Sequence, residues 1–279
     1  MSGTSSRNIA FRDRVAIDIT DGIAHVQLCR EKKRNALDEQ MVHALVEVGT
    51  FLHKQRDIRA IALSGRGKSF CSGLDLNVLQ TADEPTTGSL DLTALVQRTH
   101  GYTNLYQHLS CLWRDLPVPV IAAVHGEVFG GGLQIALGAD IRYAETNTRF
   151  SVMEIRWGLI PDMAGTQLIK GIVRLDRFKE MTYTGNVFSA DEAEQMGLVT
   201  RVFVDPIGQA LETARSIASR NPHAIRACKP LLTACYDTPL TQGLQLEATL
   251  QQQLLGSRNQ KEAVCAELEQ RTPQFLDEG

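Results

Sequence analysis

Apolar and polar residues alternate over the first thirty residues of the chain, and this pattern changes further along. The alternation is interrupted at Asp21-Gly22 and resumes beyond it. The apolar positions are Val15, Ile17, Ile19, Ile23, Val26 and Leu28. A period of two on both sides of an Asp-Gly pair is typical of two strands joined by a tight turn. We therefore predict a β-hairpin at the start of the fold.

Helical and strand patterns alternate along the next part of the chain, which indicates an α/β fold. Apolar residues three and four positions apart predict helices, and uninterrupted apolar runs predict buried strands. The predicted helices cover residues 38–52, 95–113 and 133–137, and the predicted strands cover residues 58–63, 120–124 and 141–143. We expect Asp38 to be the N-cap of the first helix. The polar segment Thr81–Ser89 is expected to be a surface loop.

The pattern becomes almost wholly helical after residue 160. Predicted helices cover residues 166–173, 177–183, 190–196 and 206–220 and most of the remaining chain. We therefore divide the chain into an α/β core at residues 1–200 and a helical C-terminal region at residues 201–279. The section Leu244–Leu268 has more apolar residues than a small lobe needs. It either packs on a neighbouring region or subunit or forms an ordinary capping helix pair.

The composition is that of an ordinary globular protein and excludes several classes of protein. Hydrophobic residues make up 43% and charged residues 22% of the 279 positions, which rules out a disordered or collagen-like chain. The 29 Lys and Arg residues nearly balance the 32 Asp and Glu residues, so nucleic acid is not an expected partner. No apolar run approaches the roughly 20 residues of a membrane span. We expect a cytoplasmic protein with no membrane partner.

Several patterns that would indicate a cofactor or a nucleophile fail on their spacing. The six cysteines are widely separated and the seven histidines lack metal-ligand spacing, so we predict no metal site. The segment from Gly65 to Ser69 resembles a P-loop, but the first glycine of that motif would fall at Ala62. Residues 130–132 lack GxGxxG spacing, and no GxSxG sequence occurs. Nucleotide-binding and serine-hydrolase sites are not supported.

Two glycine-containing turns remain, and each follows an apolar strand. They are FCSGLDL at residues 70–76 and HGEVFGGGLQIALGADI at residues 125–141. Turns without bulky side chains let backbone N–H groups point into a cleft, and the start of a helix adds its positive dipole end. Two such N–H groups can form an oxyanion hole, which stabilises negative charge on a carbonyl oxygen.

These turns belong to four blocks that resemble the crotonase superfamily, also called the enoyl-CoA hydratase/isomerase family. The blocks are CREKKRNAL at residues 29–37, GRGKSFCSGLDL at residues 65–76, GGGLQIALGADIR at residues 130–142 and SVMEIRWGLIPDMAGTQ at residues 151–167. The resemblance implies a spiral of ββα units, with a helical C-terminal region that supports trimerisation and covers the acyl pocket. It also implies an acyl-CoA thioester substrate, no cofactor besides the coenzyme A of that substrate, and a homotrimer or dimer of trimers.

The same resemblance assigns residues to a site. The two oxyanion N–H groups map onto Ser72 and Gly131. The residues expected to contact the CoA or acyl part are Lys33, Arg34, Ala36, Lys68, Phe70, Ser72, Gly73, Leu74, Asp75, Leu76, Gly130, Gly131 and Gln134. The basic side chains in this set suit the CoA phosphates, although Lys and Arg are more commonly solvated surface charges.

The acidic residues favour one reaction over another. Hydratases of the family use two glutamates, whereas this chain has Gln134 at the first position and Glu154 at the second. An amide cannot accept a proton from water, but a single carboxylate can move a proton between two carbons. We therefore favour enoyl- or dienoyl-CoA isomerisation. The alternatives are hydration, with Gln134 in place of one glutamate, and a protein that binds acyl-CoA without turnover.

Asp162 allows two interpretations. Dienoyl-CoA isomerases of the family have an aspartate at this position, so Asp162 and Glu154 could divide the acid and base roles. Asp162 also lies just before a predicted helix, where an aspartate is often an N-cap. If Glu154 is the base, an apolar pocket should raise its pKa towards neutrality. The expected lining residues are Phe70, Trp113, Met153 and Trp157.

Overall fold

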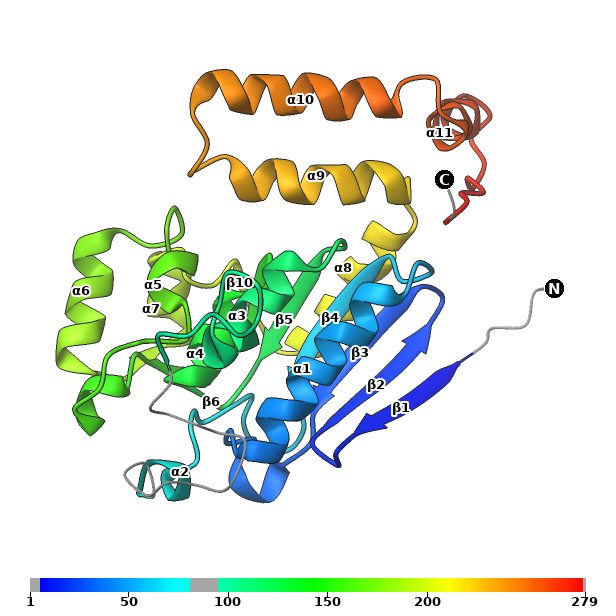
Figure 1. Cartoon of the computed structure of the whole chain (residues 1–279). Coiled ribbons are helices and arrows are strands. Elements are labelled where there is room, and N and C mark those ends of the chain that lie inside the picture. Colours follow the sequence, from blue (N-terminus) through cyan, green and yellow to red (C-terminus); the bar gives the residue numbers. More distant parts are fainter. Residues whose placement is uncertain (1–5, 81–94, 278–279) are drawn as a thin grey trace.

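The computed structural model describes residues 6–80 and 95–277 of the chain. Within these residues, seven strands form a mixed sheet in the order β1-β2-β3-β4-β5-β7-β10 (Figure 1). Their bounds are β1 (Arg7–Phe11), β2 (Val15–Thr20), β3 (Ile23–Leu28), β4 (Ala60–Gly65), β5 (Val120–Val124), β7 (Ile141–Glu145) and β10 (Arg201–Phe203). A smaller sheet has the order β6-β8-β9 and consists of β6 (Glu127–Phe129), β8 (Arg149–Ser151) and β9 (Phe188–Ser189).

The predicted hairpin at the start of the chain is confirmed. β2 and β3 pair antiparallel, and the two turn residues Asp21 and Gly22 both have positive φ. β1, which the sequence pattern did not predict, adds an outer antiparallel strand. From β3 to β10 the strands are parallel. Strands β4 and β5 are buried along their whole length, because helices cover both faces of a parallel sheet.

The helices differ in how closely they approach the sheet. On one face, α1 (Glu39–Lys54) and α3 (Leu105–Asp115) bury large aliphatic residues in the main core. On the other face, α8 (Pro206–Ala218) lies close to the strands, because Ala210, Ala214 and Ala218 meet small residues of β4 and β5. The remaining α-helices are α2 (Leu76–Gln80), α4 (Gly131–Leu137), α5 (Gly165–Leu168), α6 (Leu175–Thr184), α7 (Ala190–Gln195), α9 (Pro222–Ala234), α10 (Leu240–Leu254) and α11 (Arg258–Leu268).

Capping side chains set where two of these helices begin. The Asp38 carboxylate accepts a hydrogen bond from the Met41 N–H at 2.9 Å, so the predicted N-cap of α1 is confirmed. The second helix was predicted from residue 95 but begins at Leu105. Asn104 and Gln107 form a reciprocal capping box there, which satisfies backbone N–H groups at the true start of α3.

The C-terminal helices form a lobe above the sheet, with α10 lying outside α9 (Figure 1). The predicted boundary at residue 200 is too early, because β10 extends the main sheet and α8 packs on it. The helical lobe therefore starts at α9. Lys229 of α9 holds the lobe to the core: its ammonium donates to the carbonyls of Trp113 and Val118 at 2.9 and 2.8 Å and pairs with Asp140 at 2.9 Å.

Other predictions concern segments outside the main sheet. The strands β9 and β10 interrupt a stretch that was predicted to be wholly helical. The predicted loop Thr81–Ser89 lies outside the described residues. In the described part of the chain, no helix is long and apolar enough to cross a membrane. Those same residues contain no group of three His, Cys, Asp or Glu side chains placed to hold a metal ion.

Candidate active site

Glu154 is a buried residue that follows the second strand of the smaller sheet. β8 ends at Ser151, and a short 3-10 helix, Glu154–Trp157, begins three residues later. The Glu154 side chain is 9% exposed and faces the Gly130 turn, where an added Cβ would lie 3.4 Å from its Oε1. Burial raises the pKa of Glu154, and the negative charge of Asp162 acts in the same direction. Hydrogen bonding from the Glu154 backbone and from the Gln134 side chain lowers it but does not outweigh burial. This carboxyl is suited to accept and return a proton near neutral pH.

The amide of Gln134 is fixed by three hydrogen bonds. Its Oε1 accepts the backbone N–H groups of Met163 and Gly165, both at 2.9 Å, and its Nε2 donates to Glu154 Oε1 at 2.6 Å. Gln134 is 3% exposed on α4, so water does not compete for these contacts. The side chain joins three segments: α4, the Glu154 turn and the start of α5.

The second carboxylate oxygen of Glu154 has no such partner. Oε2 is buried and has no hydrogen-bond partner among the described residues. A buried acceptor without a donor costs free energy, and such atoms are often kept where a ligand or a reacting group completes them. Oε2 is therefore the oxygen of this carboxyl that is free for chemistry.

The predicted oxyanion donor at Ser72 is wrong, because its N–H already donates to the Arg34 carbonyl at 3.0 Å. The N–H of Leu74, two residues later, is a donor in no backbone or side-chain hydrogen bond among the described residues. Leu74 forms a parallel β-bridge with Leu37. In this bridge the Leu37 N–H donates to the Gly73 carbonyl, and the Leu37 carbonyl accepts the Asp75 N–H. This pairing turns the Leu74 N–H away from Leu37.

The second glycine turn lies directly against the first. An added Cβ at Gly73 would come within 2.9 Å of the Phe129 carbonyl and 3.6 Å of the Gly131 N, so only a glycine allows this approach. Gly130 has φ of +50° and precedes α4, whose first residue is Gly131. A first-turn N–H has no partner within its own helix. The N–H groups of Leu74 and Gly131 are therefore the pair that the geometry offers to an oxyanion.

Comparison with known proteins shows which family the chain belongs to. A family model described as enoyl-CoA hydratase/isomerase matches residues 18–278. The chain belongs to this family. A mitochondrial Delta(3,5)-Delta(2,4)-dienoyl-CoA isomerase from Mus musculus is 33% identical over 253 residues, covering 89% of this chain and 77% of that protein. An (E)-benzylidenesuccinyl-CoA hydratase from Thauera aromatica is 32% identical over 266 residues, covering 94% and 98%.

A solved structure in the family has the same fold. The crystal structure of an enoyl-CoA hydratase from Bacillus anthracis superposes with a TM-score of 0.85 at 29% identity, covering 95% of this chain and all of that one. The predicted α/β fold of the enoyl-CoA hydratase/isomerase family is thereby confirmed. Relatives in this family carry both mitochondrial and peroxisomal names, so the cytoplasmic location stays a prediction.

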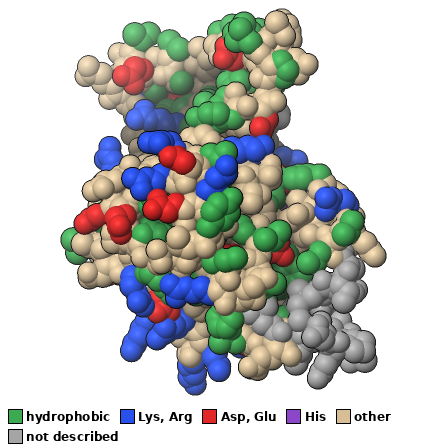
Figure 2. All heavy atoms as spheres, turned by 90° about the vertical axis from the view of Figure 1, so that its left-hand side faces the viewer, with side chains coloured by type: hydrophobic (Ala, Val, Ile, Leu, Met, Phe, Trp, Pro, Cys, Tyr) green, Lys and Arg blue, Asp and Glu red, His purple; other side chains and the backbone are tan. Residues whose placement is uncertain are grey.

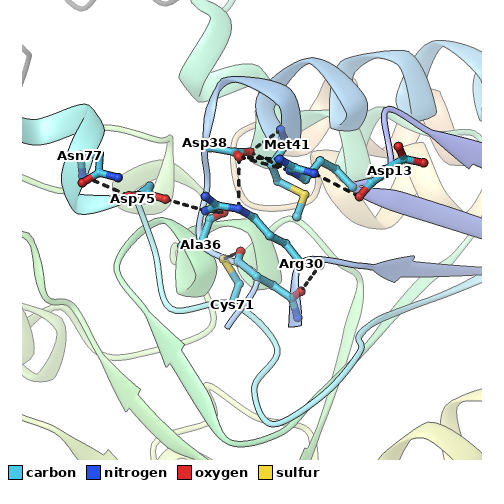
Figure 3. A network of polar contacts seen from close by, with 10 residues as sticks. Asp13, Arg30, Ala36, Asp38, Met41, Cys71, Asp75 and Asn77 are labelled. Atoms are coloured by element: carbon cyan, nitrogen blue, oxygen red, sulfur yellow. Dashed lines mark hydrogen bonds and ion pairs between the residues drawn. The ribbon is translucent and has the colours of Figure 1, made fainter. Parts of the chain in front are cut away.

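Arg30, a residue that was not predicted as part of the site, supports the turn that carries Leu74. Its guanidinium lies at the centre of a polar network (Figure 3), donating to the Asp75 carboxylate at 2.6 Å and to the Ala36 carbonyl at 3.0 Å. It also pairs with Asp38 at 3.1 Å. Burial alone would raise the pKa of Asp75, but the Asn77 N–H and Arg30 outweigh it and lower that pKa. Arg30 thus holds the turn that carries Leu74 in place through its hydrogen bonds to Asp75 and Ala36.

Asp162 is not the N-cap of the following helix. α5 begins after Ala164, which has φ of +69° and provides no side-chain cap. The N–H groups of Met163 and Gly165 are instead satisfied by Gln134 from α4, so that prediction is wrong. Asp162 lies at an exposed position, yet the protein around its carboxyl partly desolvates it and raises its pKa. Its charge raises the pKa of Glu154.

The residues predicted to contact CoA fall into two groups. Lys33, Arg34 and Lys68 are exposed, as is Leu76 of α2 at 48%. Phe70, by contrast, is fully buried in the hydrophobic core, so the prediction that its side chain contacts a ligand is wrong. Figure 2 shows Lys and Arg side chains gathered at the lower end of one face.

One of these basic residues, Arg34, is also bound to a buried carboxylate of the protein. The Arg34 guanidinium donates to both oxygens of the Glu127 carboxylate at 2.7 and 2.6 Å. Arg149 donates to the same carboxylate at 2.6 Å. Both arginine side chains remain 57% exposed, so their other N–H groups face solvent. One buried carboxylate therefore holds two guanidinium groups beside the predicted CoA segment.

The apolar lining differs from the prediction. Trp113 of α3 is fully buried in the core, and Trp157 is 52% exposed at the surface. The side chains that meet Gly131 are instead Met163, whose Sδ would lie 2.8 Å from an added Cβ, and Leu37, whose Cδ1 would lie 3.0 Å from it. Both come from segments that also position the polar site residues, so lining and catalytic geometry are set by the same turns.

Proposed function

We propose that the chain is an enoyl-CoA isomerase that moves a double bond of an acyl-CoA thioester through a stabilised enolate. The observation that carries this proposal is the Gln134 amide, which stands where hydratases of the family have a second glutamate. Its oxygen already accepts hydrogen bonds from two backbone N–H groups. Of Gln134 and Glu154, only Glu154 has a carboxyl group, and its Oε2 has no hydrogen-bond partner among the described residues. One base suffices to move a proton between two carbons, whereas adding water requires that the water be deprotonated and a carbon protonated.

The proposed step conserves atoms and charge. Glu154 Oε2 removes a proton from a carbon next to the double bond of a 3-enoyl thioester, and the electron pair moves onto the thioester oxygen. The N–H groups of Leu74 and Gly131 donate to that oxygen, and each such donor typically contributes roughly 3 to 4 kcal/mol to transition-state stabilisation. The protonated Glu154 then returns the proton to the carbon of the original double bond that is farther from the thioester. Only a proton moves, so the step needs no redox or group-carrying cofactor.

Asp162 extends the proposal to dienoyl thioesters. Its carboxyl has a raised pKa and acts on Glu154 through its charge. With two acids at the site, one can remove the proton and the other can supply one to a more distant carbon. The dienoyl-CoA isomerase name of the Mus musculus relative supports this assignment. Hydration is the second candidate, supported by the name of the Thauera aromatica relative.

We expect the basic residues of the first two blocks to hold the CoA phosphates. Lys33, Arg34 and Lys68 are exposed near the turn that carries Leu74. Arg34 reaches this turn through its own carbonyl, which accepts the Ser72 N–H. The backbone of residues 72–76 would then contact the rest of the CoA, with Gly130 and Gln134 lining the acyl end.

The proposed assembly is a homotrimer or a dimer of trimers. α10 has no buried residue, and it exposes Leu240 at 77% and Leu244 at 53%. Hydrophobic side chains also lie across the face shown in Figure 2, which is the face that carries α6. Sedimentation equilibrium should give three or six times the 30.8 kDa chain mass. A monomer mass at micromolar concentration would contradict the proposal.

The decisive test is a product assay in deuterium oxide. The protein is incubated with saturated, 2-enoyl, 3-enoyl and dienoyl-CoA thioesters, and mass and absorbance are followed together. We expect deuterium uptake with migration of the double bond and no gain of water. A gain of water would establish the hydratase instead, and binding without either change would indicate a non-catalytic acyl-CoA protein.

Glu154→Gln identifies the base in the same assay. The substitution should lower turnover about 10²- to 10⁴-fold and leave the Kd for CoA thioester within about twofold of the starting protein. Glu212→Gln on the exposed side of α8 is the matched control and should change neither quantity. Unchanged turnover in Glu154→Gln would assign the base elsewhere.

A further inference from the structure

The hydrogen bonds of Gln134 allow only one orientation of its amide. The Met163 and Gly165 N–H groups can only donate, so the atom that faces them must be the oxygen. A flipped amide would place its NH₂ group against two donors and its oxygen against the Glu154 carboxylate. Both contacts would be repulsive, so the observed orientation is the one that the surrounding backbone imposes.

This orientation makes the two oxygens of Glu154 unequal. Oε1 faces the NH₂ group of Gln134 at 2.6 Å and is held as an acceptor, whereas Oε2 has no partner among the described residues. A proton placed on Oε1 would point towards an N–H donor. The proton that Glu154 gains in the reaction therefore belongs on Oε2.

The same contacts decide what water can do at this site. A carbonyl oxygen has two lone pairs, and Gln134 Oε1 already accepts two hydrogen bonds. A water molecule next to Gln134 finds a donor there but no acceptor, so Gln134 cannot help to deprotonate it. A glutamate in this place would have a second oxygen with free lone pairs.

We infer that Gln134 is a positioning residue that selects Oε2 of Glu154 as the proton-carrying atom and directs the enzyme to isomerisation over hydration. The inference rests on the proposed function for its second part, while the positioning of Glu154 stands on the contacts alone. α4 contributes no charged group to this site, and the charge of Asp162 raises the pKa of Glu154.

Two substitutions at Gln134 test how its amide affects the pKa of Glu154. Gln134→Met keeps the length of the side chain but removes the donor to Glu154, so the pKa of Glu154 should rise. Gln134→Glu keeps an acceptor for the two backbone N–H groups and places a second carboxylate against Glu154, so that pKa should rise further. Gln167→Met removes an exposed amide of α5 that does not contact Glu154, and it should leave the pKa unchanged.

The pKa is read by infrared titration of the carboxylate band, as the difference between each protein and the same protein carrying Glu154→Gln. This measurement needs no turnover, so it tests the positioning even in an inactive variant. The expected order of the Glu154 pKa is starting protein, then Gln134→Met, then Gln134→Glu. An unchanged pKa in folded Gln134→Met would overturn the positioning role, and if that variant does not fold, an unchanged pKa in the isosteric Gln134→Glu would do so.

The choice of reaction is read from products in ¹⁸O-labelled water. We expect Gln134→Glu to form at least tenfold more ¹⁸O-labelled hydrated product than the starting protein, with a lower yield of isomer. No labelled product from Gln134→Glu would overturn the second part of the inference. If the starting protein itself hydrates its substrate, the proposed function fails, while the order of pKa values still decides whether Gln134 positions Glu154.

Discussion

The Arg30 guanidinium donates to the Asp75 carboxylate at 2.6 Å and so connects the segment at residues 29–37 to the turn that carries Leu74. Arg30 also holds the Ala36 carbonyl, next to the residue that bridges Leu74. The position of the Leu74 N–H therefore depends on a partly buried ion pair. A displacement of about 1 Å in such a donor is enough to cost a large part of its effect on catalysis.

Arg30→Gln should impair catalysis and stability together. Loss of the charged donor leaves Asp75 Oδ2 and the Ala36 carbonyl without this partner, while Asp75 Oδ1 keeps the Asn77 N–H, so we expect a loss of about 2 to 3 kcal/mol in the free energy of unfolding. Turnover should fall about ten- to hundredfold as the turn loosens. Urea denaturation and steady-state kinetics check the two effects. Arg174→Gln, which removes an exposed arginine paired with Asp176, should change neither.

The same ion pair predicts a dependence of stability on pH. The folded-state pKa of Asp75 is lowered, so its contribution is complete above the unfolded pKa of about 3.9 and is lost as the pH falls through the folded value. Asp75→Asn should lose this acid-dependent component. Equal pH slopes below about pH 4 in the two proteins would contradict the assignment.

The sequence predicted the parts of the fold and site that depend on neighbours in the chain. The Asp38 cap and the Asp-Gly hairpin are local features, and both are present. The Ser72 assignment failed because the direction of an N–H depends on a bridge to Leu37, a contact that no local pattern reveals. The N-cap interpretation of Asp162 failed for the same reason, since Gln134 from another helix satisfies the N–H groups at the start of α5.

Asp162 provides a direct comparison with a true N-cap. Asp205 accepts the Gly208 N–H at 2.9 Å and caps α8, whereas Asp162 caps no helix. Asp205→Ala should cost about 1 kcal/mol of stability and leave turnover unchanged. Asp162→Ala should leave the melting temperature unchanged and lower turnover on dienoyl thioesters about 10²-fold or more. The opposite pattern would return Asp162 to a structural role.

We expect the charge of Asp162 to affect the pH dependence of turnover as well. Because this carboxylate raises the pKa of Glu154, its removal should lower that pKa and move the acidic limb of the kcat profile to lower pH. The profile of Asp162→Ala on 3-enoyl thioesters, which need only one base, isolates this effect. A limb that stays in place would show that the two carboxyl groups are not coupled in solution.

Gly131→Ala tests the space at the oxyanion donor. An alanine methyl would meet Met163 Sδ at 2.8 Å and Leu37 Cδ1 at 3.0 Å, and both are ends of flexible side chains, so the protein should still fold. Their displacement into the site should lower kcat about ten- to hundredfold. Met163→Ala in the same chain should restore part of this loss. Gly243→Ala in α10, where an added Cβ meets nothing within 4 Å, should gain about 0.5 to 1 kcal/mol of stability with unchanged kinetics.

Lys229→Met tests how the C-terminal lobe is held to the core. The substitution leaves two buried carbonyls and the Asp140 carboxylate without their shared donor, and breaking a buried pair in this way typically costs about 3 to 5 kcal/mol. Asp140 keeps the Val120 N–H as a donor at 2.7 Å, so the loss should fall at the lower end of that range. Lys170→Met removes a half-exposed partner of Asp237 and should cost less than about 1 kcal/mol. Urea denaturation of both variants measures the difference, and equal losses would mean that Lys229 does not anchor α9.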